Sequence, residues 1–297
     1  MDKAIIIQNL VKDFPGTRAL SGVSFSVEKG SIHGFLGPNG AGKSTTMRII
    51  TGLMPSTSGE VTVDGRIGFL AENPPLYLNM TVRDYLQFVL EIHSQNFKPI
   101  YKIDSAIEKC GLGSVEKRLI GNLSKGFKQR VGIAQTLVHN PEIIILDEPT
   151  VGLDPKALVE IRNLILSLRG DHTVLLSSHQ LNEVSLLCSH ISIINSGEII
   201  KSGPLKEMRK TFKGQQVIEI TVDRWDPSID QKLIKQFDLA KVEWDNEADQ
   251  PLLRLYSRST NDIRPELARF MLDNERHLYG IQQVETNLED MFNQMTR

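Results

Sequence analysis

The stretch Gly37-Pro-Asn-Gly-Ala-Gly-Lys-Ser-Thr45 decides how this chain folds. An apolar run, Ile32–Leu36, comes before it, and a helix-forming segment, Lys43–Ile50, comes after it. Glycines between a strand and a helix let backbone N–H groups approach an anion, and the helix N-terminus adds partial positive charge at that point. In this setting the pattern G-x-x-x-x-G-K-[ST] predicts a site for a nucleoside triphosphate, with Lys43 on the terminal phosphates and Ser44 on Mg²⁺.

Length and composition restrict the class of protein. A chain of 297 residues suits two domains, and 40% hydrophobic with 24% charged residues is ordinary for a globular protein. The net charge of −2 and the lack of long single-sign runs argue against a nucleic-acid partner. No apolar stretch approaches the roughly 20 residues of a membrane span, and the first residues suggest a strand rather than a signal peptide. Any membrane spans are therefore expected on another polypeptide.

The two cysteines, Cys110 and Cys188, lie in periodic segments and are expected to be small buried thiols in a reducing compartment.

Strand-like and helix-like segments alternate along residues 1–210. This alternation predicts an α/β domain with a mainly parallel sheet, and residues 75–140 are expected to form a helical subdomain within it. Thr81 and Ser124 are the expected N-caps of two of its helices. Two turns predict hairpins: Asp64-Gly65 between strands 60–63 and 66–70, and Ser196-Gly197 between strands 190–195 and 198–202.

A second domain is predicted over residues 215–297, after a polar, basic boundary at residues 208–214. Strands and helices follow there in the order βαββαβ, which fits a small α+β domain of the ferredoxin-like split type. A regulatory or dimer-stabilising role is one interpretation, and the residues leave that role open.

Two carboxylates, Asp147 and Glu148, close the apolar run Ile143–Leu146. A solvated turn is the simpler interpretation of such a pair. Because a phosphate-binding loop lies upstream, we instead expect Asp147 to orient Mg²⁺ and Glu148 to activate the attacking water. His179 directly follows another predicted strand, at the same carboxyl edge of the sheet. It is interpreted either as a surface or capping residue or as a contact to the γ-phosphate.

Basic residues surround the N-cap in Leu123-Ser-Lys-Gly-Phe-Lys-Gln-Arg130. Positive charge opposes the helix dipole at this end, which suggests a phosphate from outside the chain's own loop. The stretches 37–45, 123–130, 143–149, Gly152-Leu-Asp154 and Ser178-His179 together resemble the motifs of ATP-binding-cassette ATPases in order and spacing. The likeness covers about residues 1–203 and implies a P-loop nucleotide-binding cassette fold.

The resemblance implies a head-to-tail homodimer with two ATP molecules at its interface. Ser124 and Gly126 of one subunit would contact the ATP held by the other, Phe14 would stack on adenine, and Asp154 would lie at the dimer interface. The loop residues that would bind the nucleotide are Gly37, Pro38, Asn39, Gly40, Ala41, Gly42, Lys43, Ser44 and Thr45. Ser44, Glu72 and Asp147 would hold the metal, and Glu148 and His179 would be catalytic.

Two departures from the family pattern stand out. Lys125 and Phe127 replace a usual Gly and Gln, while Ser124 and Gly126 are retained, so ATP clamping is expected to survive. Glu72 stands where a metal-sensing Gln is usual. This difference leaves open how strongly ATP hydrolysis is coupled to transport.

The apolar segment 73–80 follows Glu72 directly. Ordinary packing explains it, and the resemblance offers a groove for a helix from an integral membrane permease. The single cassette, residues 71–75 and the ending 287–292 are most similar to bacterial exporter-type proteins of antibiotic export and gliding motility. The leading hypothesis is an ATPase subunit on the cytoplasmic face of the plasma membrane that powers an exporter whose membrane spans are on a separate chain. A soluble non-transport cassette ATPase and an ATP-switched scaffold are the alternatives.

Overall fold

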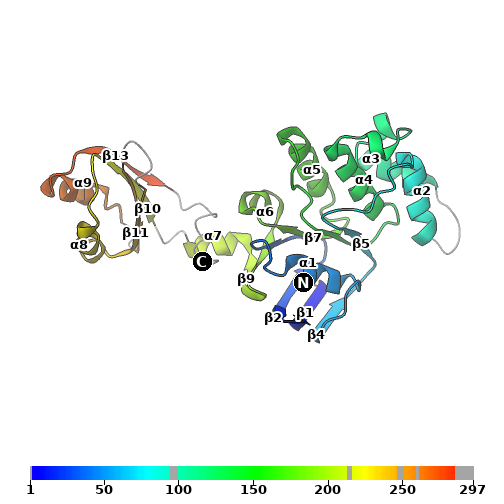
Figure 1. Cartoon of the computed structure of the whole chain (residues 1–297), viewed down its shortest axis with the longest axis horizontal. Coiled ribbons are helices and arrows are strands. Elements are labelled where there is room, and N and C mark those ends of the chain that lie inside the picture. The colour runs from blue at the N-terminus through cyan, green and yellow to red at the C-terminus, as the bar shows by residue number, and fades with distance from the viewer. Residues whose placement is uncertain (1, 94–99, 213–215, 246–250, 259–260, 285–297) are drawn as a thin grey trace. The chain divides into compact units, whose positions relative to one another are not determined.

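The computed structural model describes residues 2–93, 100–212, 216–245, 251–258 and 261–284. The chain divides into two compact units, the first ending at Leu205 and the second beginning at Lys206, and each is described by itself (Figure 1). The exporter-like ending 287–292 lies outside the described residues.

The first unit contains two sheets. The three-stranded antiparallel sheet has the order β2-β1-β4, with bounds β1 Lys3–Phe14, β2 Thr17–Glu28 and β4 Ser58–Val63. The six-stranded sheet has the order β5-β6-β7-β3-β8-β9 and is parallel except for its last strand. Its strands are β3 Ile32–Leu36, β5 Ile67–Leu70, β6 Ile143–Leu146, β7 Thr173–Ser178, β8 His190–Asn195 and β9 Glu198–Pro204. The predicted α/β class is therefore confirmed.

Strands β3, β6 and β7 are buried along their whole length, as expected of parallel strands covered on both faces. Helix α1 (Lys43–Ile50) packs between the two sheets, where Met47 shares a core with Ile5 of β1 and Phe35 of β3. The first unit also contains α5 Pro155–Ser167 and α6 Leu181–Leu187, and α7 Leu205–Phe212 begins at its last residue.

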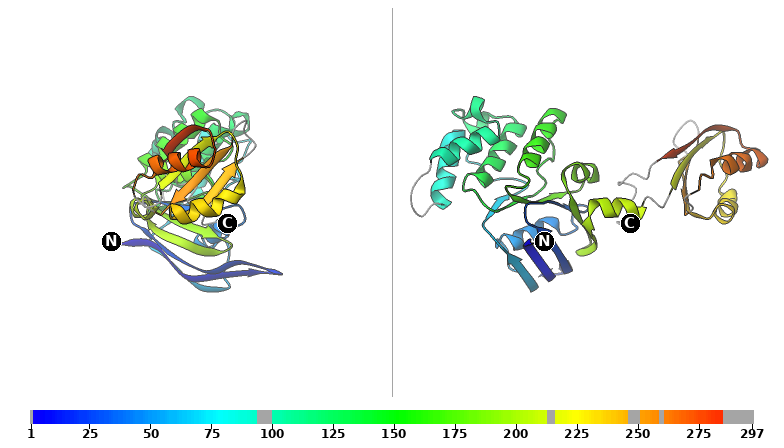
Figure 2. Two further views of the ribbon diagram at one scale, coloured as in Figure 1. Left: turned by 90° about the vertical axis from the view of Figure 1, so that its left-hand side faces the viewer. Right: turned by 180° about the vertical axis from the view of Figure 1, so that it is seen from behind.

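The helical block consists of α2 (Val82–His93), α3 (Ile100–Lys109) and α4 (Lys125–Leu137). Figure 2 shows it on one side of the six-stranded sheet, with the three-stranded sheet on the other. Thr81 caps α2, because its hydroxyl accepts from the Asp84 N–H at 3.2 Å and donates to the Asp84 carboxylate at 2.6 Å. The predicted helical character of this region is confirmed.

The predicted hairpin at Asp64-Gly65 is wrong. Strand β4 pairs with β1 in the small sheet, whereas β5 pairs in parallel with β6 in the large one. Gly65, at φ +136°, lies where the chain passes from one sheet to the other. The second predicted hairpin is confirmed, since Asn195 of β8 pairs with Glu198 of β9.

The second unit has the predicted order of elements and one antiparallel sheet, β11-β12-β10-β13. Leu233 of α8 and Phe270 of α9 pack on Ile218 and Leu255 of the sheet. The bounds are β10 Gln216–Val222, α8 Asp230–Gln236, β11 Leu239–Asp245, β12 Leu252–Ser257, α9 Arg264–Asp273 and β13 Leu278–Val284. The boundary at residues 208–214 is helical up to Phe212, because the buried Leu205 and Met208 give α7 an apolar side.

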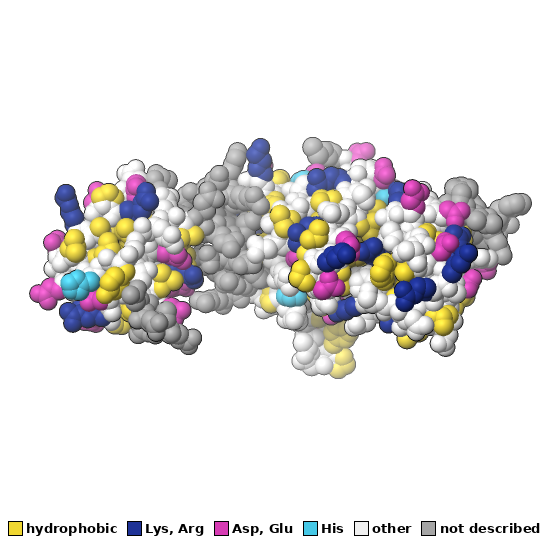
Figure 3. All heavy atoms as spheres, turned by 90° about the horizontal axis from the view of Figure 1, so that it is seen from above, with side chains coloured by type: hydrophobic (Ala, Val, Ile, Leu, Met, Phe, Trp, Pro, Cys, Tyr) yellow, Lys and Arg dark blue, Asp and Glu magenta, His cyan; other side chains and the backbone are white. Residues whose placement is uncertain are grey.

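Both cysteines are buried free thiols, as predicted. Within the described ranges, no helix is long and apolar enough to cross a bilayer. On the face drawn in Figure 3, Lys and Arg side chains are interspersed with Asp and Glu, which agrees with the small net charge.

Candidate nucleotide-binding site

The loop after β3 follows a path that requires glycine at two points. A Cβ on Gly37 would lie 2.4 Å from the Ile194 carbonyl oxygen. Gly42 has φ +106°, and its Cβ would lie 2.6 Å from Leu20 Cδ2. Both substitutions would push the loop off β2 and β8, so the glycines bring its backbone close to the sheet.

Lys43 begins α1, and its side chain is buried at 6% exposure. Its ammonium donates to the Gly37 carbonyl at 2.8 Å and the Pro38 carbonyl at 3.2 Å, and it lies 3.2 Å from Glu148 Oε1. The first turn of α1 contains no acidic residue. Its backbone N–H groups have no partner within the helix, so they and the ammonium make this end of α1 positive.

Asp147 and Glu148 follow β6 and are both buried. Between them lies the Ser177 hydroxyl of β7, which donates to Asp147 Oδ1 at 2.6 Å and accepts from the Glu148 N–H at 2.8 Å. Ser177 is fully buried. One hydroxyl therefore fixes the acidic pair to the neighbouring strand.

Glu148 has a left-handed backbone, φ +48°, which directs its side chain away from the strand path. Its Oε2 lies 2.9 Å from His179 Nδ1, while Oε1 forms the ion pair with Lys43. That ion pair lacks hydrogen-bond geometry, because Oε1 has no hydrogen-bond partner among the described residues. The carboxylate thus lies between an ammonium and an imidazole.

A cavity of about 420 Å³ opens in front of these groups. The loop, Glu72, Glu148 and His179 all contribute to its wall. The lining residues are Ala19, Asn39, Gly40, Gly42, Lys43, Ser44, Thr45, Glu72, Glu148, Val151 and His179. The structure therefore gathers most of the predicted site residues around one hollow.

Other predicted residues lie elsewhere. Phe14 ends β1 outside the cavity lining, is 41% exposed, and has the Lys12 ammonium 5.1 Å from its ring centre. Asp147 is buried and does not line the cavity, and its carboxylate accepts from Ser177.

The N-termini of α4 and α5 lie against each other. Ser124 caps α4 by accepting from the Phe127 N–H at 3.4 Å, and Asp154 caps α5 by accepting from the Ala157 N–H at 2.9 Å. A Cβ on Gly126 would come within 2.8 Å of the Ala157 Cβ. Ser124, Gly126 and Asp154 do not line the cavity of their own chain.

Two contacts join α4 to the segment that follows Glu148. The buried Gln129 donates its side-chain amide to the Pro149 carbonyl at 2.9 Å, and Arg130 forms an ion pair with Glu160 of α5. No sequence motif assigns a role to Gln129 or Ser177. For Ser177 the available signal was a polar side chain that follows an apolar run, where burial requires a partner, whereas Gln129 stands between Lys128 and Arg130 and gives no such signal.

The oxygen donors suit Mg²⁺. Ser44 and Glu72 line the cavity, and Asp147 directly precedes the lining residue Glu148. Across the described ranges, no three His, Cys, Asp or Glu side chains cluster as a protein-only metal site. Mg²⁺ typically uses one or two carboxylates together with substrate phosphates and water, so these residues fit that ion.

Comparison with known proteins identifies the family. The sequence model described as "ABC transporter" matches residues 20–151. The bacitracin transport ATP-binding protein BcrA of Bacillus licheniformis is 34% identical over 310 residues, which span 98% of this chain and 97% of BcrA. The chain belongs to the ABC transporter family. The linearmycin resistance ATP-binding protein LnrL of Bacillus subtilis is 35% identical to this ABC protein, over 72% of this chain and 74% of LnrL.

A solved structure extends the likeness. The dimeric post-hydrolysis state of the ATP-binding cassette MJ0796, bound to ADP and phosphate, matches with TM-score 0.62 and 25% identity, over 68% of this chain and 98% of that one. This ABC protein is the ATP-binding subunit of a transporter, and it binds and hydrolyses ATP.

Proposed function

We propose that this ABC ATPase powers the export of antibiotic-like compounds through a permease on a separate chain, at the cytoplasmic face of the plasma membrane. The similarity to a bacitracin transport protein and a linearmycin resistance protein supports export. The observation that carries the proposal is the single cavity lined by the loop, Glu148 and His179, because it holds phosphate-binding and hydrolytic groups together.

The triphosphate binds along residues 37–45. Backbone N–H groups at the start of α1 and the Lys43 ammonium bind the phosphates. The contact between Lys43 and phosphate replaces the ion pair that Lys43 forms with Glu148 in this structure. Phe14 stacks on adenine when the nucleotide is bound. Its 41% exposure at the end of β1 supports this role, because much of the side chain is open to a ligand even with the Lys12 ammonium 5.1 Å from the ring centre.

Glu148 acts as the general base in hydrolysis. It takes a proton from the water that attacks the γ-phosphate, and ADP leaves with the bridging oxygen. His179 orients Glu148 through the 2.9 Å contact at Nδ1, and its other ring nitrogen, now 3.5 Å from the Gln180 side-chain amide, would contact the γ-phosphate when ATP is bound. Ser177 fixes the positions of the Glu148 backbone and the Asp147 carboxylate relative to each other, because its hydroxyl bonds to both.

Mg²⁺, when bound with ATP, neutralises developing charge on the phosphates. Ser44, Glu72 and Asp147 are the residues that would hold it. The Glu72 carboxylate can accept from a metal-bound water, as a Gln carbonyl would.

The second half of each site comes from a second copy of the chain. Ser124, Gly126 and Asp154 lie outside the cavity of their own subunit, which supports a role across a two-fold dimer. The resemblance to a dimeric cassette supports the same arrangement. In such a dimer ATP joins the subunits, and loss of phosphate releases them.

Residues 1–210 form the ATP-binding domain in this proposal, with the helical subdomain at about 75–140, and residues 215–297 form an accessory domain. The βαββαβ order and the β11-β12-β10-β13 sheet support a ferredoxin-like fold for the accessory domain. A groove beside residues 75–77 is the docking surface for the permease.

Purification of the tagged full chain from membranes in detergent tests the proposal. We expect a multi-span membrane chain to co-purify and Glu148→Gln to abolish ATP hydrolysis, while Glu198→Gln, which alters an exposed carboxylate, leaves hydrolysis unchanged. A chain recovered only without a membrane partner, or an active Glu148→Gln variant, would contradict it.

A further inference from the structure

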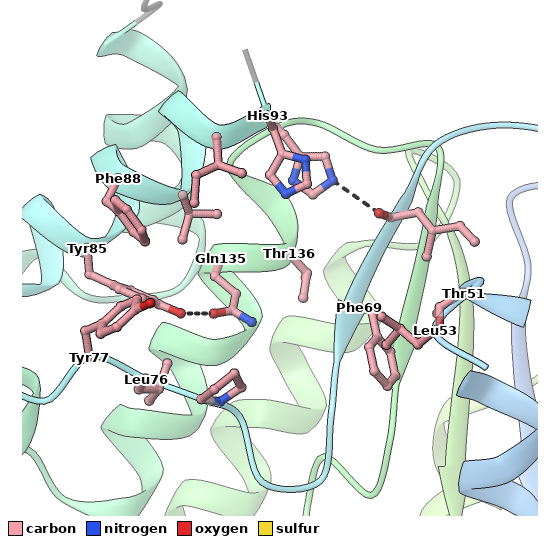
Figure 4. Close-up of a pocket in the computed structure, with 15 residues that line it drawn as sticks. Thr51, Leu53, Phe69, Leu76, Tyr77, Tyr85, Phe88, His93, Gln135 and Thr136 are labelled. Atoms are coloured by element: carbon pink, nitrogen blue, oxygen red, sulfur yellow. Dashed lines mark hydrogen bonds between the residues drawn. The ribbon is translucent and has the colours of Figure 1, made fainter. Parts of the chain in front are cut away.

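Helix α4 contains two glutamines that point to different parts of the molecule. Gln135 faces the open groove drawn in Figure 4, where its amide oxygen accepts from the Tyr85 hydroxyl. Gln129 is buried at 8% exposure, and its amide donates to the Pro149 carbonyl at 2.9 Å. Because Pro149 directly follows Glu148, Gln129 bonds to the backbone next to the proposed general base.

A close approach of α4 to α5 places Gln129 within reach of Pro149. Gly126 and Gln129 lie one turn apart on the same face of α4. On that face a Cβ on Gly126 would come within 2.8 Å of the Ala157 Cβ of α5. Glycine at this position therefore lets α4 lie close to the residues between Glu148 and α5, and a side chain there would hold Gln129 farther from Pro149.

Glu148 has a backbone conformation that is unfavourable for two reasons. Its φ of +48° lies in the left-handed region, which residues other than glycine rarely adopt. The residue before a proline is also normally extended, because the proline ring collides with its backbone in other conformations. A strained conformation of this kind persists only where the surrounding structure fixes it from several sides.

Hydrogen bonds on both sides of Glu148 give this support. Before its side chain, the Glu148 N–H donates to Ser177 Oγ at 2.8 Å, and after it Gln129 holds the Pro149 carbonyl. The Glu148 carbonyl accepts from the Val151 N–H at 3.3 Å, which closes a turn. Pro149 is buried, so loss of the Gln129 amide would leave its carbonyl without a ready replacement.

We propose that Gln129 is a positioning residue for Glu148. Its bond to the Pro149 carbonyl keeps the strained backbone in place, and with it the Glu148 carboxylate on the wall of the nucleotide cavity, 2.9 Å from His179 Nδ1. Without this bond the backbone can relax toward an extended conformation and turn the carboxylate away from the attacking water. The inference rests on the proposed function, in which Glu148 is the general base.

Two substitutions in the full chain test this role. Gln129→Met keeps the length of the side chain and removes the donor, whereas Gln129→Glu places a carboxylate, which cannot donate, against the carbonyl. Misplacement of a catalytic group by about 1 Å can cost about 100-fold in rate. We expect steady-state kcat to fall about 10- to 100-fold for both variants, while ATP titration gives an affinity within about twofold of the parent.

His172→Phe is the matched control. The buried His172 donates from Nδ1 to the Pro141 carbonyl at 2.7 Å, ahead of β6, whereas Pro149 lies beyond the other end of that strand. Phenylalanine keeps an aromatic ring and removes the donor, so this variant also loses a buried bond to a proline carbonyl. It should lower the unfolding temperature as Gln129→Met does and leave kcat unchanged.

The outcomes separate this inference from the proposed function. If Gln129→Met keeps the parental kcat, or loses no more of it than His172→Phe, then Gln129 only fills space and the positioning role is wrong, while the assignment of Glu148 stands. A parallel loss of kcat and ATP affinity would also overturn the role, because it indicates general damage to the fold.

Two further results complete the test. If Gln129→Met does not fold, Gln129→Glu decides alone, and a kcat within about twofold of the parent would contradict the proposal. If Glu148→Gln still hydrolyses ATP, the general base is wrongly assigned, and both the positioning role and the proposed function fail.

Discussion

Removal of one hydroxyl, by Ser177→Ala, should uncouple ATP hydrolysis from ATP binding. Ser177 does not line the cavity, so nucleotide affinity should change little. Its hydroxyl holds Asp147 at 2.6 Å and the Glu148 N–H at 2.8 Å. Without it the backbone of the general base can shift from its strained φ of +48°.

The sizes of the expected losses in stability and in kcat follow from the two hydrogen bonds that Ser177→Ala removes. Two buried polar groups left without a partner cost about 1–3 kcal/mol each, so the free energy of unfolding should fall by about 2–6 kcal/mol. Supporting contacts of this kind typically change activity about 10- to 100-fold, which corresponds to about 1.4–2.7 kcal/mol in the barrier. We therefore expect kcat to fall by that factor at almost constant ATP affinity.

The assay compares steady-state ATPase activity, ATP titration and thermal unfolding with those of Ser192→Ala. Ser192 is an equally buried hydroxyl on β8, 2.9 Å from His33 Nε2 and 2.7 Å from Ser202 Oγ. Its loss should lower stability to a similar extent and leave kcat unchanged. The reasoning is refuted if both variants lose kcat equally or if Ser177→Ala stays within twofold of the parent.

Three further changes have defined outcomes. Lys43→Ala should weaken ATP binding about 10- to 100-fold in a titration, because charge-assisted contacts to phosphate are lost, and unchanged affinity would overturn the phosphate assignment. Gly42→Ala should lower the unfolding temperature more than Gly40→Ala, since only the Gly42 Cβ meets atoms within 4 Å, and equal shifts would argue against that contact. Burial lowers the pKa of His33 to about 3. Between pH 6.5 and pH 3 the unfolded chain therefore binds a proton at His33 that the folded chain does not bind. Up to about 5 kcal/mol of the free energy of unfolding is lost as the pH falls through this range. His33→Gln should flatten this dependence in denaturant titrations, and an unchanged slope would contradict the assignment.

The sequence contained enough to predict the large sheet and the loop, because both depend on local patterns. Fully apolar runs such as Ile143–Leu146 indicate strands covered on both faces, and glycines ahead of Lys43 indicate an anion-binding turn. The hairpin error at Asp64-Gly65 shows the limit of such patterns. A turn signal predicts a change of direction, whereas pairing of β4 with β1 depends on contacts nearly 60 residues apart.

Some site residues could not be predicted from the sequence for a related reason. Ser177 acts through Asp147 and Glu148, which lie about 30 residues earlier and become neighbours only when β6 and β7 pair. The boundary expected at residues 208–214 lies a few residues beyond the division between the two units at Leu205 and Lys206, and the buried Leu205 and Met208 give α7 an apolar side that extends the helix to Phe212.

The oligomeric state of Glu148→Gln tests the shared-site mechanism most directly. The substitution removes the proton acceptor and keeps the loop, Ser124 and Gly126, so ATP should bind without being consumed. Size-exclusion chromatography with light scattering should then give a dimer of about twice 33.3 kDa with ATP and a monomer with ADP. A monomer in the presence of saturating ATP would contradict the account.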